Sequence, residues 1–143
     1  KLSVKLVSLH RMEFNIRKLN PSDYDDVLVG WWKDWGWKAP AKDFLPENGE
    51  GGLMVLDDIK PVCAGFLYIS NSKVAWVEWI ISNKNYKKKD KALNLLLDTL
   101  ILTSENLNMK YIFATNDNKT LIKRFVGKGF QKGSTTTELI KVI

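Results

Sequence analysis

Residues 74–115 constrain the fold of this chain more than any other part of the sequence. An apolar segment over residues 74–82 is followed by a polar loop, a leucine-rich segment over residues 92–107 and a second apolar segment over residues 110–115. The leucines recur at steps of three and four residues, which is the period of one helix face. Two strands joined by such a helix pair in parallel through a right-handed crossover. The sequence therefore predicts a β-α-β unit.

The flanking segments add strands and helices to this unit. Further strands are expected over residues 14–19, 52–56, 62–69 and 135–142. Further helices are expected over residues 20–35, with Asn20 as N-cap and Gly36 as terminator, and over residues 118–126. We therefore predict an α/β (α+β) fold with a central mixed, mostly antiparallel sheet of six or seven strands and helices on both faces.

The length of 143 residues suits one domain, which we place at residues 14–143. Residues 1–13 are interpreted as an extension or a leading strand, because Met12 directly precedes the first clear strand. No apolar run reaches the roughly 20 residues of a membrane span. The single cysteine, Cys63, and the single histidine, His10, exclude a disulfide framework and a zinc site of Cys and His from one chain. We expect no metal, no membrane partner, a buried inert Cys63 thiol and a cytoplasmic location.

Basic residues concentrate in one loop. The formal net charge is +6, and five of the eight residues 84–91 are lysines. The loop leads into the helix expected at residue 92, where free backbone N–H groups and the helix dipole favour an anion. We interpret the segment as a phosphate-binding site, although a solvated turn without a ligand would show the same charge run.

Two short motifs flank the strand over residues 110–115. In the first, the aromatic Tyr86 is followed by Lys87, Asp90 and Ala92. The second comprises Asn118, Leu121, Arg124, Phe125, Gly129 and Phe130. Both resemble motifs of the GNAT superfamily of acetyl-CoA-dependent N-acetyltransferases. The family's loop pattern is Arg/Gln-x-x-Gly-x-Gly/Ala after an aromatic residue, so Lys87 takes the Arg/Gln place and Ala92 the last place, whereas Asp90 replaces the first glycine. The six residues of the second motif fall on the family's second pattern at matching spacing.

The resemblance implies acetyl-CoA as cofactor. The residues that it places at the cofactor are Ile81, Lys87, Lys88, Lys89, Asp90, Lys91, Ala92, Asn118 and Phe125. Asp90 is also a good N-cap, and a carboxylate that caps the helix would compete with a pyrophosphate for the same N–H groups. Asn118 is expected at the pantetheine or as the cap of the short helix, or in both roles.

The resemblance also implies catalytic positions on the strand over residues 74–82. A backbone N–H there polarises the thioester carbonyl, and we assign it to Ile81. Glu78 is the only acid of the strand, and desolvation should raise its pKa toward that of a useful general base; an outward-facing ion pair is the alternative. Phe125 stands where the family carries a general-acid tyrosine, so Tyr86 and Tyr111 are considered as substitutes.

The acceptor side is predicted at the first helix and the loop after it, where four of the six tryptophans fall within residues 31–37. Trp32, Trp35 and Trp37 are the candidate substrate-binding residues, because an aromatic wall holds a cation or a planar ring. Trp31, Trp32 and Trp35 also fit one helical stripe, so core packing is the competing interpretation. Acids that could favour an amine lie nearby, at Asp34, Asp43 and Glu47.

Three functions are compatible with the sequence. The first is an N-acetyltransferase acting on a primary amine of a small molecule, peptide or protein. The second is a catalytically degraded relative that binds acyl-CoA or a partner protein, which Phe125 and Asp90 favour. The third, a nucleic-acid-binding module, rests on basic charge and aromatics but lacks any recognisable motif. A homodimer is left open.

Overall fold

Five strands form one mixed sheet in the computed structural model, which describes residues 14–143. The strands are β1 (Asn15–Lys18), β2 (Gly52–Asp57), β3 (Lys60–Ile69), β4 (Val74–Ser82) and β5 (Tyr111–Phe113), in the order β1-β2-β3-β4-β5. The first four run antiparallel to their neighbours, and β5 pairs parallel with β4, as the crossover predicts. The extension proposed at residues 1–13 lies outside the described residues.

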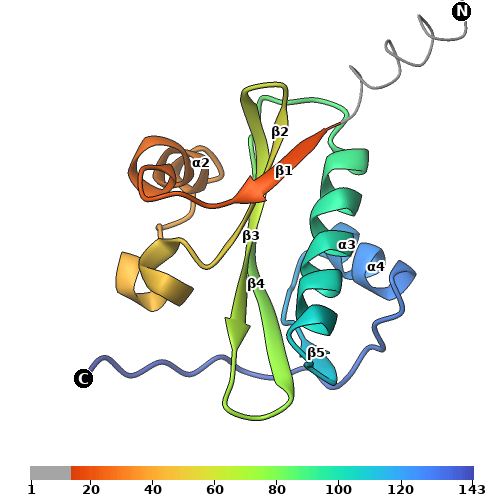
Figure 1. Cartoon of the computed structure of the whole chain (residues 1–143). Helices are drawn as coiled ribbons and strands as arrows, with labels where there is room; N and C mark the ends of the chain where they lie inside the picture. The colour runs from red at the N-terminus through yellow and green to blue at the C-terminus, as the bar shows by residue number, and fades with distance from the viewer. Residues whose placement is uncertain (1–13) are drawn as a thin grey trace, which may run out of the picture.

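Helices cover both faces of the sheet (Figure 1). One face carries α3 (Asp90–Asn106) and α4 (Lys119–Gly127). The other face carries a π-helical turn, η1 (Tyr24–Leu28), continued by α2 (Val29–Asp34), and the short turns η2 (Lys42–Phe44) and η3 (Pro46–Gly49). The mixed α/β architecture predicted from the sequence is confirmed.

Two apolar cores result, one on each side of the sheet. The leucine stripe of α3 packs against one face, whereas Trp31 and Trp32 of α2 pack against Phe66 and Ile81 on the other. Among the described residues, no helix is both long enough and apolar enough to cross a membrane.

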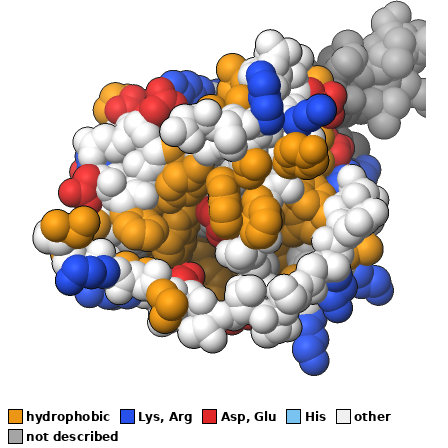
Figure 2. Space-filling model, turned by 90° about the horizontal axis from the view of Figure 1, so that it is seen from below, with side chains coloured by type: hydrophobic (Ala, Val, Ile, Leu, Met, Phe, Trp, Pro, Cys, Tyr) orange, Lys and Arg blue, Asp and Glu red, His pale blue; other side chains and the backbone are white. Residues whose placement is uncertain are grey.

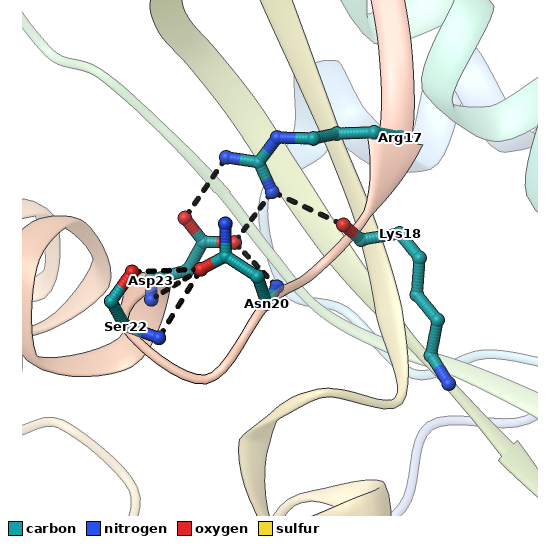
Figure 3. Close-up of polar contacts among 5 residues, drawn as sticks. All are labelled: Arg17, Lys18, Asn20, Ser22 and Asp23. Carbon is teal, nitrogen blue, oxygen red and sulfur yellow. Dashed lines mark hydrogen bonds and ion pairs between the residues drawn. The ribbon is translucent and has the colours of Figure 1, made fainter.

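The link between β1 and the first helix is held by a buried carboxylate. Asp23 is only 3% exposed and accepts hydrogen bonds from both terminal nitrogens of Arg17, at 2.7 and 3.0 Å (Figure 3). It also accepts a bond from the Asn20 amide at 2.8 Å. The Asn20 side-chain oxygen in turn accepts bonds from the amides of Ser22 and Asp23, each at 3.2 Å. Asn20 thus fixes the turn before the helix, whereas the N-cap itself is Asp23, three residues after the position expected from the sequence.

The strand expected over residues 135–142 is absent from the described part of the chain, so the sheet has five strands rather than six or seven. Residues 130–143 have no regular secondary structure. Leu139 and Val142 are 88% and 91% exposed, so the segment buries neither of these side chains. A strand needs a partner edge as well as an alternating pattern, and β5 offers an edge of only three residues.

Candidate cofactor and acceptor site

The strands β4 and β5 separate halfway along β4. Their parallel ladder has three pairs and ends at Trp76 and Phe113. Beyond this point the amide and the hydroxyl of Thr115 donate to Oε1 of Glu78, at 3.0 and 2.9 Å. A side chain from β4 therefore lies where a backbone carbonyl would continue the ladder, and the two strands diverge toward the loop that precedes α3.

A β-bulge in β4 lies at the same level. Ala64 pairs with Ile81 but Phe66 pairs with Glu78, so β4 has one residue more than β3 in this interval. Within it, Trp79 has a φ of 57°, a left-handed conformation that is unusual for a bulky residue. A β-bulge changes the direction in which side chains point and is common beside functional sites. A strained backbone conformation persists only where the surrounding packing enforces it.

The packing that holds the bulge is specific. The Trp79 indole donates to the Tyr68 hydroxyl at 2.9 Å and meets the buried Trp32 ring edge-on at 6.3 Å. Gly65 lies opposite the bulge on β3, where an added Cβ would come within 2.5 Å of the Ile80 side chain. A glycine is thus needed at position 65 for close approach rather than for its backbone freedom.

The start of α3 offers a set of free backbone donors. The first backbone bond of the helix runs from the Leu93 amide to the Lys89 carbonyl, at 2.9 Å. Within residues 14–143, the amides of residues 87–92 have no hydrogen-bond acceptor. Three lysine side chains of this segment are exposed, those of Lys87, Lys88 and Lys91. Free amides, the helix dipole and mobile positive charge suit a diphosphate.

The two other loop lysines turn toward the first helix. Lys84 and Lys89 place their ammonium groups 5.3 and 5.2 Å from the centre of the Trp35 ring. Lys89 also donates to the Ser82 hydroxyl at 3.3 Å and to the Asn83 carbonyl at 3.1 Å. Burial lowers the pKa of Lys89. Lys89 thus stabilises the loop through these contacts and does not face the exposed amides.

Asp90 does not cap α3, which corrects the expectation from sequence. It is the first residue of the helix, and its carboxylate bonds to the Arg124 guanidinium of α4 at 2.7 Å. The preceding residue, Lys89, takes the N-cap position without a side-chain cap bond. The left-handed residue of the loop is Lys88, with φ of 60°, so position 90 itself needs no glycine. The helix amides are therefore not blocked by Asp90.

Most residues of the second motif have structural roles. The Asn118 side chain accepts a bond from the Leu121 amide at 2.9 Å and caps α4. Phe125 is 6% exposed and packs edge-on against Phe130 at 5.0 Å, so its ring belongs to the core. Ala92, the last position of the first motif, lies in the first turn of α3, and its side chain is fully buried. A contact of these residues with a cofactor stays a prediction.

Ile81 is a core residue, 2% exposed. The adjacent Asn83 amide donates to the Val62 carbonyl at 2.8 Å. Since N–H directions alternate along an antiparallel ladder, the Ile81 amide points toward β3 and that of Ser82 points away. The register therefore does not support Ile81 as the amide that polarises a carbonyl on the β5 side.

Glu78 lies in the divergence of the two strands, on the face that α2, η2 and η3 cover. Burial raises its pKa, which agrees with the expectation from its apolar surroundings. The bonds from Thr115 oppose this shift, and the negative charge of Glu138 adds to it. Within residues 14–143, both hydrogen bonds to the carboxylate reach Oε1, and Glu78 belongs to no ion pair, so the surface ion-pair alternative is not met.

Neither tyrosine considered as a substitute acid is close to Glu78. The Tyr86 hydroxyl donates to Asp57 at 2.7 Å, at the β2–β3 turn. Tyr111 pairs with Val74, four residues before Glu78 and thus about 13 Å away along the strand.

Most of the tryptophans that were predicted to form a binding wall lie in the apolar core. Trp32 is 1% exposed and so cannot touch an acceptor in this conformation, and the Trp35 indole donates to the Ser82 carbonyl at 2.8 Å. Trp37 is 52% exposed and stacks on Trp35 at 5.9 Å. Sequence reasoning missed instead the aromatic residues that share the sheet face of Glu78. They are Tyr68 on β3, Trp76 on β4 and Phe113 on β5, with Phe44 of η2 opposite.

The face of the molecule seen in Figure 2 is hollowed. Figure 2 shows hydrophobic side chains gathered around a depression, with acidic side-chain atoms inside it. The alternating pattern of β3 and β4 could have indicated that these aromatic residues share one face of the sheet. The pairing of Tyr68 with Trp76, however, follows only from the register of the two strands.

Comparison with known proteins finds similarity in structure alone. No protein-family model and no curated protein matches the chain. Among solved structures, it superimposes with a TM-score of 0.71 and 14% identity on N-acetylglutamate synthase from Neisseria gonorrhoeae complexed with coenzyme A and L-arginine. That match covers 85% of this chain but 28% of the other, so this chain spans less than a third of that protein.

Other solved structures match over most of their own length. Glucosamine-6-phosphate N-acetyltransferase from Arabidopsis thaliana gives a TM-score of 0.64 at 14% identity, over 90% of this chain and 98% of that one. Ard1 from Thermoplasma volcanium gives 0.70 at 16% identity, over 85% and 84%. At such identities a likeness reports on the fold. With its mixed sheet and these structural matches, the chain has the fold of the GNAT acetyltransferases.

Proposed function

We propose that this protein is an N-acetyltransferase that takes its acetyl group from acetyl-CoA and transfers it to a primary amine. The observation that carries the proposal is the divergence of β4 and β5, which leads from the Glu78 carboxylate toward the free amides at the start of α3. Structural neighbours whose complexes contain coenzyme A support the choice of donor.

The residues around the start of α3 fit the phosphate groups of such a donor. The amides of residues 87–92 and the exposed ammonium groups of Lys87, Lys88 and Lys91 would hold its phosphates. Acetyl-CoA, when bound, supplies the acetyl group as a thioester. The Asp90 carboxylate is neutralised by Arg124 and therefore opposes anion binding only weakly.

Glu78 would prepare the acceptor. An amine reacts only when neutral, and an ammonium beside a half-buried carboxylate can give its proton to Oε2, directly or through water. The raised pKa of Glu78 makes the carboxylate a better base than an exposed glutamate. Thr115 fixes the carboxylate through Oε1.

Cofactor binding is tested by thermal shift with acetyl-CoA and coenzyme A. Both ligands should raise the Tm, because a ligand that binds only the folded state stabilises it. Replacing Lys87, Lys88 and Lys91 together by Ala should abolish the shift, whereas Lys73→Ala, at the β3–β4 turn, should preserve it. A Tm that neither ligand raises would contradict the proposal.

Catalysis is tested by thiol release from acetyl-CoA in the presence of a panel of amines. Glu78→Gln should lower turnover by about 10² or more while the thermal shift with coenzyme A persists. The matched control is Glu105→Gln near the end of α3, which should act like the parent protein. Equal turnover in both variants would remove Glu78 from the mechanism.

A catalytically silent acyl-CoA-binding protein is the second candidate, and the buried Phe125 at the usual general-acid position favours it. It predicts a thermal shift with coenzyme A but no thiol release with any amine. A shift with a short oligonucleotide alone would instead support nucleic-acid binding.

A further inference from the structure

Five aromatic side chains form a continuous surface beside Glu78. The Phe44 ring meets Trp79 edge-on at 5.9 Å, and the Trp79 indole donates to the Tyr68 hydroxyl. Tyr68 is the cross-strand partner of Trp76, whose ring lies 4.3 Å from that of Phe113. We call these five residues the aromatic cluster. Its members come from η2, β3, β4 and β5, so only the folded chain brings them together.

Much of the aromatic cluster is open to solvent. Phe44 and Phe113 are 47% and 51% exposed, and the other three rings are only partly buried. Trp79, Tyr68 and Trp76 thus connect two rings that are each about half exposed. An exposed aromatic surface of this kind marks a place where a ligand or partner is bound.

The charges beside the aromatic cluster select a cation. Glu78 shares the sheet face of Trp76, and both of its described hydrogen bonds reach the same oxygen. The tail residue Glu138 adds a second negative charge close enough to affect Glu78. Tryptophan and phenylalanine faces also attract a cation. Among residues 14–143 the Glu78 carboxylate has no ion-pair partner, and a carboxylate of this kind beside aromatic rings is complementary to an ammonium group.

We propose that the acceptor is a primary amine carried on a flat apolar body, with the ammonium on Glu78 and the ring against Trp76 and Phe113. This inference rests on the proposed function, because it takes the surface beside Glu78 as the acceptor site. It disfavours polyamines as acceptors, since a flexible chain with several charges offers the rings no flat face and gives Glu78 more ammonium groups than it can pair.

The test is direct binding without any acetyl donor, measured by calorimetry with 2-phenylethylamine, its neutral analogue 2-phenylethanol, and spermidine. 2-Phenylethylamine should bind at least tenfold more tightly than either of the others. Glu78→Gln should remove the advantage over 2-phenylethanol. Equal or tighter binding of spermidine would overturn the inference.

Variants locate the site. Trp76→Ala and Phe113→Leu, the latter a mild change at an exposed ring, should each weaken 2-phenylethylamine binding severalfold or more. Trp37→Ala, which alters an exposed tryptophan outside the aromatic cluster, should have no effect. Binding that falls with Trp37→Ala but not with Trp76→Ala or Phe113→Leu would place the amine elsewhere. Because no donor is present, a failure of acetyl-CoA binding would refute the transferase proposal separately.

Discussion

The buried Asp23 carboxylate anchors the start of the first helix to β1. Asp23→Ala removes three hydrogen bonds, two from Arg17 and one from the Asn20 amide. A hydrogen bond to a charged group contributes about 1.5–3 kcal/mol, and breaking a buried pair costs about 3–5 kcal/mol. The Arg17 side chain is 36% exposed and can regain water. We therefore expect the lower end, about 3 kcal/mol.

The assay is urea unfolding followed by tryptophan fluorescence. In thermal unfolding, the same loss of about 3 kcal/mol corresponds to a Tm that is lower by roughly 10 °C for a domain of this size. The matched control is Asp25→Ala, two residues away. Asp25 is 71% exposed and lies 3.7 Å from the Lys42 ammonium, so its loss should cost under about 0.5 kcal/mol. Equal losses in the two variants would refute the reasoning, because burial would then not decide the effect.

Three further predictions concern the site. Burial raises the pKa of Glu78 in the folded protein above 4.5, its ordinary value. Ionisation of Glu78 therefore destabilises the fold as pH rises from 4.5 through the raised pKa. The free energy of unfolding of the parent protein should accordingly fall relative to that of Glu78→Gln as pH rises from 4.5 toward neutrality. A Tm difference between the two that does not change over this range would contradict the argument. Asp90→Asn should free the Arg124 charge and tighten coenzyme A binding about fivefold at low salt and less at high salt; calorimetry showing weaker binding would oppose it. Burial raises the pKa of Cys63 to about 12, so the native protein should resist alkylation by iodoacetamide at pH 8 and react only in denaturant; rapid labelling of the folded chain would contradict its burial.

The local pattern of the sequence determined most of the elements. The leucine period predicted α3 and hence the parallel β4–β5 pair, and the lysine loop indicated where helix amides are free. The rise in the pKa of Glu78 also followed from its neighbours, because a lone acid in an apolar strand is desolvated in almost any fold.

Only the tertiary structure decided how side chains from distant segments meet. Asp90 looked like a cap, but Arg124 of α4 reaches its carboxylate. The tryptophans of the first helix looked like a binding wall, yet Trp32 is core, because a helix must bury its apolar stripe against the sheet. The segment over residues 135–142 alternates like a strand, but a pattern forms no ladder without an edge to pair with. The aromatic cluster depends on the β3–β4 register and on η2 folding over it. No local period of the sequence encodes such contacts.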